Sequence, residues 1–253
     1  EGLGGVVGKR LAALERVRRA GMTKINVDLV YGLPSQTLET LTRTLDLALA
    51  LAPDRFAVFG YAHVPWMKPH QKLIPSETLP DAAARSAMAA LVSERLVGDG
   101  YVRVGLDHYA RPADKLARAV ANRRLRRNFQ GYVADESPWV VGIGASAISS
   151  LPGGFSQNVV DPAEYMAAMD RGGFATVRGF AVGPEDRLRG DVIGQLMCSY
   201  VADIGGTCQK YGADPNAFLA GIDGLARLVR DGLVSIDGER LAVDLNRRSD
   251  YGG

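Results

Sequence analysis

The chain has 253 residues, of which 47% are hydrophobic and 23% are charged, and its formal net charge at pH 7 is +2. This composition is typical of a globular protein with a buried core and excludes a disordered, collagen-like or coiled-coil chain. No apolar run approaches the roughly 18 residues of a membrane helix, and the near-zero charge predicts no general attraction to nucleic acid or membranes. The two cysteines, Cys198 and Cys208, are too few for a disulfide scaffold or a four-ligand metal site.

The amino-terminal segment carries no basic-then-apolar leader, and we therefore expect a cytoplasmic location. The sequence begins at Glu1 rather than at a methionine, from which we expect a piece of a longer protein. Leu11, Leu14 and Val17 recur at helical spacing, and Gly21 is a typical C-terminal stop. These residues predict a short amphipathic helix.

Strands and helices are predicted to alternate from there to about residue 106. The strands are rich in β-branched and aromatic residues, and glycine or proline follows each element. The predicted strands are 25–31, 56–62 and 101–106, and the predicted helices are 37–51 and 81–97. This alternation favours right-handed crossovers and a parallel sheet, whose strands we expect to be covered on both faces.

A polar residue in the first of these strands is a candidate for a functional site. Asn26, Asp28 and Val30 share one face because side chains alternate along a strand. We expect Asp28 near the carboxyl end of its strand, where α/β sheets and barrels bind ligands. A strand aspartate is as often a structural partner of an arginine or a backbone amide, so both interpretations stay open.

A basic run without acidic residues lies between Asp114 and Asp135. Guanidinium groups bind carboxylates and phosphates through paired hydrogen bonds. Three interpretations are open: a solvated helix face, a pocket for an anionic ligand, and a nucleic-acid surface, of which the near-zero net charge disfavours the last. The arginines of the run are Arg118, Arg123, Arg124, Arg126 and Arg127, and Asn128-Phe129-Gln130-Gly131-Tyr132 follows them.

The segment 142–149 consists mainly of small residues and admits two interpretations. A ligand can approach its backbone closely, or the segment packs tightly under a strand, and its spacing matches neither a dinucleotide fingerprint nor a P-loop. The three histidines show no metal-type pairing. His108 follows a predicted strand and is a possible acid or base, although a structural role is the more common one.

From about residue 186 the pattern changes to helices at 186–203 and 215–231, followed by a β-hairpin around Asp237-Gly238. This order predicts a small helical, winged-helix-like domain. We therefore expect two domains, 1–180 and 181–253, of which the last residues, 246–253, are polar and frayed.

Five segments, read in order, resemble the oxygen-independent coproporphyrinogen III oxidases (coproporphyrinogen dehydrogenases), radical S-adenosylmethionine (SAM) oxidoreductases of heme biosynthesis. The match runs from about Gly21 to Val243 and concerns the carboxyl-terminal portion of the family. It implies an α/β fold, namely the second half of a TIM-like, partial radical SAM barrel with parallel strands, and a small C-terminal domain. The segments are 25–34 (INVDLVYGLP), 59–65 (FGYAHVP), 105–112 (GLDHYARP), 127–132 (RNFQGY) and 142–149 (GIGASAIS).

The resemblance implies the oxidative decarboxylation of coproporphyrinogen III to protoporphyrinogen IX, in which two propionates become vinyl groups. The implied cofactors are SAM and a [4Fe–4S] cluster, and the implied partner is an electron donor, with the protein a monomer. Asp28, Ala62 and Ile148 match residues that contact SAM in the family. Phe129 and Gln130 match the pair beside the second SAM molecule and are the candidate catalytic residues. We further expect Arg126 and Arg127 to bind substrate carboxylates.

One family feature is missing. The family's cluster ligands are three cysteines spaced C-x3-C-x2-C on the amino-terminal side of these segments, whereas Cys198 and Cys208 have the wrong spacing and position. We therefore expect no metal ligands in this chain and no activity of the chain alone. Half a barrel also exposes sheet edges and an open apolar face, from which we expect low stability.

Three alternatives are kept. A heme-binding chaperone of the same superfamily is disfavoured by the 105–112 and 127–132 segments, which look like the oxidase versions, and tight stoichiometric heme binding would favour it. A catalytically inactive remnant is the second. A DNA-binding module is the third, and the mixed charges of residues 217–240 disfavour it because they form no basic stripe.

Overall fold

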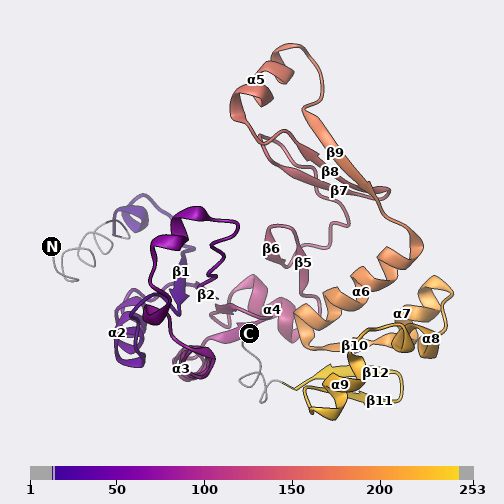
Figure 1. The fold of residues 1–253 in the computed structure, drawn as a ribbon. Coiled ribbons are helices and arrows are strands. Elements are labelled where there is room, and N and C mark those ends of the chain that lie inside the picture. Colours follow the sequence, from indigo (N-terminus) through magenta and orange to yellow (C-terminus); the bar gives the residue numbers. More distant parts are fainter. Residues whose placement is uncertain (1–12, 14, 245–253) are drawn as a thin grey trace. The chain divides into compact units, whose positions relative to one another are not determined.

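The structure is a computed structural model that describes residue 13 and residues 15–244. The chain forms two compact units, one made of the described residues up to Arg123 together with Asp244, and one of Arg124–Val243 (Figure 1). Residues 15–19 are helical and Gly21 has a positive φ of 85°, as predicted, whereas Leu11 and Leu14 lie outside the described residues. No helix of the described residues is long and apolar enough to cross a membrane.

The first unit is built around a four-stranded sheet of order β1-β2-β4-β3. Three α-helices and two short 3₁₀ helices join or follow its strands. The strands are β1 (Asn26–Tyr31), β2 (Arg55–Gly60), β3 (Val102–Val104) and β4 (His108–Ala110); the helices are α2 (Leu38–Leu49), η1 (Pro69–Leu73), η2 (Ser76–Thr78), α3 (Ala82–Gly98) and α4 (Lys115–Ala121). The predicted strands and helices of this region are therefore confirmed to within a few residues.

The sheet is mixed rather than wholly parallel, which corrects the prediction. β1 and β2 are parallel, but β4 is antiparallel to both β2 and β3. Since β3 opposes β4 and β4 opposes β2, β3 does run in the predicted direction. A hairpin through Gly105, whose φ is +58°, inserts β4 between β2 and β3. A short reversal of this kind needs only a left-handed glycine and no crossover helix.

Helices α2 and α3 cover one face of this sheet. Thr37 begins α2 with a capping box that includes Thr40, and the side chain of Asp81 caps α3. The core residues are Leu41 and Leu45 of α2, Met88, Val92 and Leu96 of α3, and Phe56 and Val58 of β2. On β1, Asn26, Asp28 and Val30 are exposed, so the expectation that both faces are covered is wrong for this strand.

The second unit contains two small sheets and a helical region with a third (Figure 1). A two-residue turn joins β5 to β6, and β7, β8 and β9 form an antiparallel sheet that α5 adjoins. The elements are β5 (Arg126–Asn128), β6 (Gly131–Val133), β7 (Ile148–Leu151), β8 (Gly154–Asn158), α5 (Pro162–Asp170), β9 (Thr176–Ala181), α6 (Pro184–Ser199), β10 (Val201–Asp203), α7 (Ile204–Tyr211), α8 (Pro215–Ala220), α9 (Leu225–Arg230), β11 (Val234–Asp237) and β12 (Arg240–Val243).

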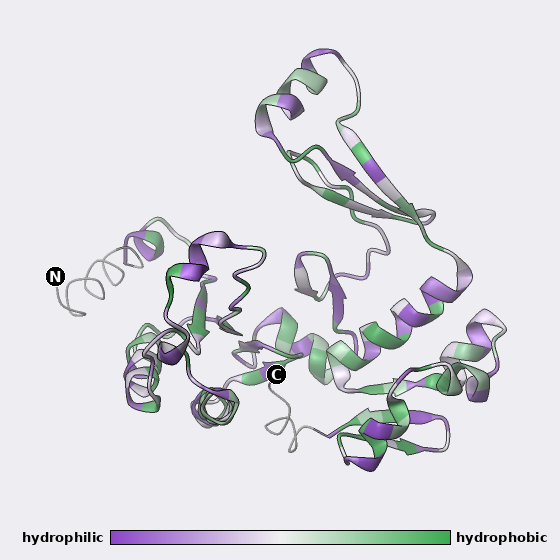
Figure 2. Ribbon diagram, in the orientation of Figure 1, coloured by the Kyte–Doolittle hydropathy of each residue, from purple (hydrophilic) through white to green (hydrophobic). Residues whose placement is uncertain are grey.

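Residues 184–243 have a hydrophobic core of their own. It includes residues of α6, β10, α7 and β12, and α6 shows both hydrophilic and hydrophobic turns because only one of its faces meets that core (Figure 2). The core residues are Leu188, Val192, Ala202, Ile204, Cys208, Leu225, Val234 and Leu241. The compact units divide at Arg123. The predicted domain boundary at residue 180, the barrel half and the winged-helix-like domain stay predictions.

Within this region two helix predictions need correction. The helix predicted at 186–203 ends at Ser199, because Tyr200 takes a left-handed conformation and β10 follows. The helix predicted at 215–231 is two helices, α8 and α9, separated at Gly221–Gly224. The hairpin at Asp237-Gly238 is confirmed by the antiparallel pairing of β11 with β12. Residues 246–253, predicted to be frayed, lie outside the described residues.

A buried ion pair fastens β2 to α4. The side chain of Asp114 is 3% exposed and accepts hydrogen bonds from Nε of Arg55 at 2.9 Å and from the backbone N–H of Leu116 at 2.8 Å, while Nη2 of Arg55 lies 2.9 Å from Oδ1. Asp114 therefore caps α4 and neutralises a partly buried guanidinium in one place.

Replacing Asp114 with alanine should lower the free energy of unfolding of the first unit by about 3 kcal/mol, because Arg55 would keep its charge without a partner. Urea unfolding followed by circular dichroism measures this change. Asp46→Ala is the matched control, since Asp46 pairs with Arg95 on the surface and such pairs contribute less than about 1 kcal/mol. Equal shifts for the two variants would contradict the assignment.

Candidate functional site

Asp28 lies on the exposed face of β1, the edge strand of the described sheet. Its Oδ1 accepts a hydrogen bond from Nδ2 of Asn26 at 2.5 Å, and Val30, on the same face, is 39% exposed. Asp28 pairs in register with Ala57 of β2, which places it in the middle of β1 rather than near its carboxyl end. The partner that the structure shows is the side-chain amide of Asn26, and both interpretations of Asp28 stay open.

Ala62 is exposed in the loop that follows β2, past the carboxyl end of that strand. The loop begins where the N–H of Tyr61 donates to the carbonyl of Tyr31 at 2.7 Å, so the ends of β1 and β2 are joined. The side-chain amide of Gln71 then holds the carbonyl of Ala62 and the N–H of Val64. Sequence analysis missed Gln71, because a glutamine in a polar turn carries no local signal of its partners.

The same loop contains a polar atom that suits a ligand. Nδ1 of His63 is buried and has no hydrogen-bond partner among the described residues. Buried polar atoms in proteins are almost always paired, and exceptions occur at binding sites. This nitrogen and the exposed residue Ala62 lie in the loop past the carboxyl end of β2, whereas Asp28 lies in the middle of β1.

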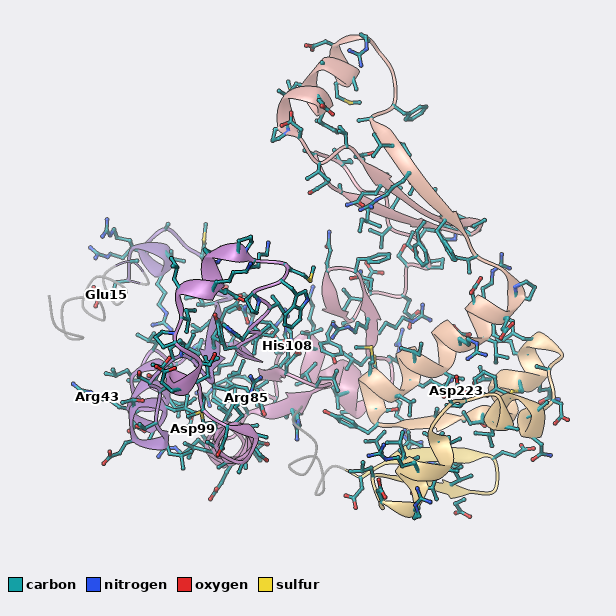
Figure 3. The ribbon with its side chains drawn as sticks, viewed as in Figure 1. Glu15, Arg43, Arg85, Asp99, His108 and Asp223 are labelled. Carbon is teal, nitrogen blue, oxygen red and sulfur yellow. The ribbon has the colours of Figure 1, made fainter. Side chains whose placement is uncertain are left out.

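His108 lies in β4 itself, where it was predicted to follow a strand. Its Nδ1 is 2.6 Å from Oδ1 of Asp107, and its ring meets the ring of Phe59 edge-on at 6.0 Å between centroids. A carboxylate on Nδ1 fixes the orientation of an imidazole, as in sites of proton transfer. Figure 3 labels His108 and Arg85, both in the first unit.

Tyr31, the last residue of β1, also belongs to this unit. Burial raises the pKa of its phenol, and the charge of Arg85 opposes this shift.

Phe129 and Gln130 form the turn between β5 and β6. The strands pair as Asn128 with Gly131, which leaves these two residues at the tip of the hairpin. Oδ1 of Asn128 accepts the N–H of Gln130 at 2.9 Å, and Gly131 has a φ of +128° that suits only glycine. Phe129 is 55% exposed and meets the ring of Phe155 edge-on at 5.0 Å. The hairpin thus presents an aromatic ring and an amide side by side.

The predicted arginine cluster is not one surface. Arg126 and Arg127 are neighbours on β5 and therefore point to opposite faces of the hairpin. Nη1 of Arg126 donates to the backbone carbonyl of Glu136 at 3.1 Å, whereas the guanidinium of Arg127 stacks over the ring of Tyr132 at 4.9 Å. Arg124 pairs with the Glu136 carboxylate. Only Arg118 lies in a helix, so the interpretation as a single helix face is wrong.

Ile148 begins β7 and pairs with Gln157 of β8. A methyl group at Gly142 would lie 2.7 Å from the backbone carbonyl carbon and oxygen of Ile148, closer than atoms can approach. The N–H of Gly142 also donates to Oγ of Ser149 at 3.0 Å. Tight packing under a strand, one of the two interpretations of the 142–149 segment, is therefore confirmed at Gly142, and the role of Ile148 in binding stays a prediction.

The residues present do not fit an iron–sulfur cluster. Cys198 lies in α6 and Cys208 in α7, and burial raises the pKa of each thiol, although Arg127 partly opposes the shift at Cys198. The family's cluster needs three cysteine ligands, and the chain has only these two. Residues 13 and 15–244 contain no group of three or more His, Cys, Asp or Glu side chains that could hold a metal ion.

The predicted site residues therefore fall into two sets. Asp28 and Ala62 lie on neighbouring parallel strands, or just beyond them, in the first unit. The second unit carries the rest, namely Arg126, Arg127, Phe129, Gln130 and Ile148.

Comparison with solved structures places this fold in a class of enzymes. The chain superposes on the coproporphyrinogen III oxidase from Escherichia coli, which is described as a radical SAM enzyme, with a TM-score of 0.84 and 36% identity. The superposition covers 94% of this chain and 55% of that one. No protein-family model matches the chain.

Curated relatives identify the family. The oxygen-independent coproporphyrinogen III oxidase of Bradyrhizobium diazoefficiens is 47% identical over 92% of this chain and 52% of its own length. That of Thermostichus vulcanus is 38% identical over 91% of this chain and 71% of its own length. The chain belongs to the oxygen-independent coproporphyrinogen III oxidase family. It spans about half the length of the first curated relatives it matches.

The cysteine environment yields a direct test. After anaerobic incubation with ferrous iron and sulfide, followed by desalting, the chain should retain no more iron or acid-labile sulfide than its C198S/C208S double variant, because neither thiol is placed to ligate a cluster. Iron and sulfide assays and the visible absorption spectrum measure this. Iron retained by the wild-type chain and lost in the double variant would contradict it.

Proposed function

We propose that this chain is the carboxyl-terminal part of a radical SAM enzyme that converts coproporphyrinogen III to protoporphyrinogen IX in heme biosynthesis. In this reaction two propionate side chains lose carbon dioxide and become vinyl groups. The observation that carries the proposal is the similarity over 92% of the chain to an enzyme of that name. The superposition on a radical SAM coproporphyrinogen III oxidase supports it.

Asp28, Ala62 and Ile148 are each proposed to contact a SAM molecule. A carboxylate accepts hydrogen bonds from hydroxyl and ammonium groups, an exposed backbone segment can both donate and accept them, and isoleucine offers apolar surface. Phe129 and Gln130 are proposed to act beside the second SAM molecule, where a ring can stack and an amide can orient a polar group. When bound, SAM supplies the radical that begins the reaction in this superfamily.

The [4Fe–4S] cluster must be held by residues other than those described here, because neither cysteine fits it. We therefore propose that the chain alone is inactive and that it works with a polypeptide segment carrying the cluster ligands. A cytoplasmic location, a monomeric enzyme and an electron donor as partner belong to the same proposal. None of the alternative functions gains support from a particular contact in the structure.

A chimera tests the proposed function. The chain replaces the 52% of the Bradyrhizobium diazoefficiens enzyme that it matches, and the chimera is purified anaerobically with its cluster. We expect SAM-dependent formation of protoporphyrinogen IX, measured as porphyrin fluorescence after oxidation.

Gln130→Ala in this chimera should lower kcat by about 100-fold, since misplacement of a reacting group costs this much. The exposed Arg43→Ala of α2 is the control and should leave kcat unchanged.

An inactive chimera, made beside an active parent enzyme, would contradict the proposal. Heme titration of the chain then separates the remaining possibilities: tight, one-to-one binding would favour a heme chaperone, and no binding would favour a catalytically inactive remnant. Equal activity of Gln130→Ala and Arg43→Ala would remove Gln130 from the site while leaving the reaction assigned.

The two arginines of β5 should differ in substrate binding. Stacking on Tyr132 occupies the face of the Arg127 guanidinium and leaves its edge donors available for a carboxylate, whereas Arg126 uses a donor on Glu136. Arg127→Lys in the chimera should raise the Kd of coproporphyrinogen III about tenfold, or about 1.4 kcal/mol. Arg126→Lys, at the second proposed carboxylate ligand, should raise it less. Anaerobic equilibrium dialysis measures both, and unchanged binding in the R126A/R127A variant would refute the carboxylate assignment.

A further inference from the structure

The side chain of Gln71 bonds the loop after β2 at two points. It lies in η1, it is 9% exposed, and it is one of three buried polar residues of the described chain, with Asp114 and Thr207. Its Nε2 donates to the carbonyl oxygen of Ala62 at 3.1 Å, and its Oε1 accepts the N–H of Val64 at 2.6 Å. Because one planar amide makes both bonds, it fixes the distance and the orientation of the backbone between Ala62 and Val64.

This stretch of backbone needs such a contact. Tyr61 still bonds to the end of β1, and the next backbone bonds begin only where the N–H groups of Met67 and Lys68 donate to the carbonyl of Val64 at 2.9 Å. Pro65 lacks an N–H. Between those points the Gln71 amide supplies the hydrogen bonds that the backbone makes to a neighbouring element, and it does so on either side of His63.

Both hydrogen bonds of the Gln71 side chain are made to the loop after β2, which lies outside the hydrophobic core of the first unit. None of the residues in the core cluster of the first unit belongs to η1 or to residues 61–64. Both ends of the amide are committed to the segment that carries Ala62 and the unpartnered Nδ1 of His63.

We propose that Gln71 is a positioning residue for SAM. By holding the backbone of Ala62–Val64, it preorganises the surface that the cofactor meets, without touching the cofactor itself. A binding surface held within a fraction of an ångström needs such support from residues behind it, and loss of that support weakens binding. This inference rests on the proposed function, in which Ala62 contacts SAM.

Two substitutions and a matched control test it. Gln71→Glu keeps an acceptor for the N–H of Val64 but places an oxygen against the carbonyl of Ala62, and Gln71→Met keeps the length without either bond. Gln36→Glu is the control, because Oε1 of Gln36 only accepts, from the N–H groups of Gly32 and Leu33 at the end of β1. It adds the same charge in the same unit while a carboxylate preserves both of its bonds.

Amide hydrogen exchange of the 253-residue chain measures the contact, and SAM affinity of the chimera measures its consequence. We expect Gln71→Met to speed exchange at Val64 about tenfold, and both Gln71 variants to raise the Kd and the KM of SAM about tenfold with kcat within twofold of wild type. Gln36→Glu should change SAM affinity less than twofold. A purely structural role would instead shift the urea midpoint and leave KM unchanged.

Faster exchange at Val64 with unaltered SAM affinity would overturn the positioning role. Equal losses of affinity in Gln71→Glu and Gln36→Glu would overturn it as well, since added charge would then be the cause. If the wild-type chimera fails to bind SAM, the proposed function falls and this inference with it, and exchange at Val64 still shows whether the Gln71 contact exists.

Discussion

The parallel pairing of β1 with β2 is the constraint on which the first unit depends. The two strands pair in register, from Asn26 with Arg55 to Tyr31 with Gly60. Both strands therefore end at the same edge of the sheet, and the loops after them start side by side. The bond from Tyr61 to Tyr31 continues that pairing by one residue, and Gln71 then takes over. Backbone pairing therefore holds the start of this loop, and a side chain holds the part that follows.

Local signals are enough to predict many elements of this fold. α2 and α3 begin at Thr37 and Asp81, whose side chains cap them, and the hairpin at Asp237-Gly238 follows from its turn residues. β4 is different, because its insertion between β2 and β3 depends on which edge of β2 is open, a property of the assembled sheet. The helix predicted at 215–231 fails for a different and local reason, since Gly221 ends α8 and Gly224 precedes α9.

The residues of the candidate site also differ in whether the sequence alone can reveal them. Asp28 stands out in the sequence because a carboxylate is unusual in a strand, and the Phe129-Gln130 pair is found through a family motif, as is Ala62. The separation of Arg126 from Arg127 follows from strand alternation, but only once β5 is known to be a strand and not the end of a helix. Gln71 could not be found at all, because its partners are backbone atoms seven and nine residues away.

The contact between Gly142 and the backbone of Ile148 has a consequence for how this family's sequences are compared. Any side chain at position 142 would collide with main-chain atoms that cannot move aside without breaking the start of β7. We therefore expect a glycine at this position wherever this part of the sheet is kept, whatever the ligand. Its persistence among relatives would record a steric requirement of the sheet, and a glycine-rich signature in this segment would identify a packing motif as readily as a binding motif.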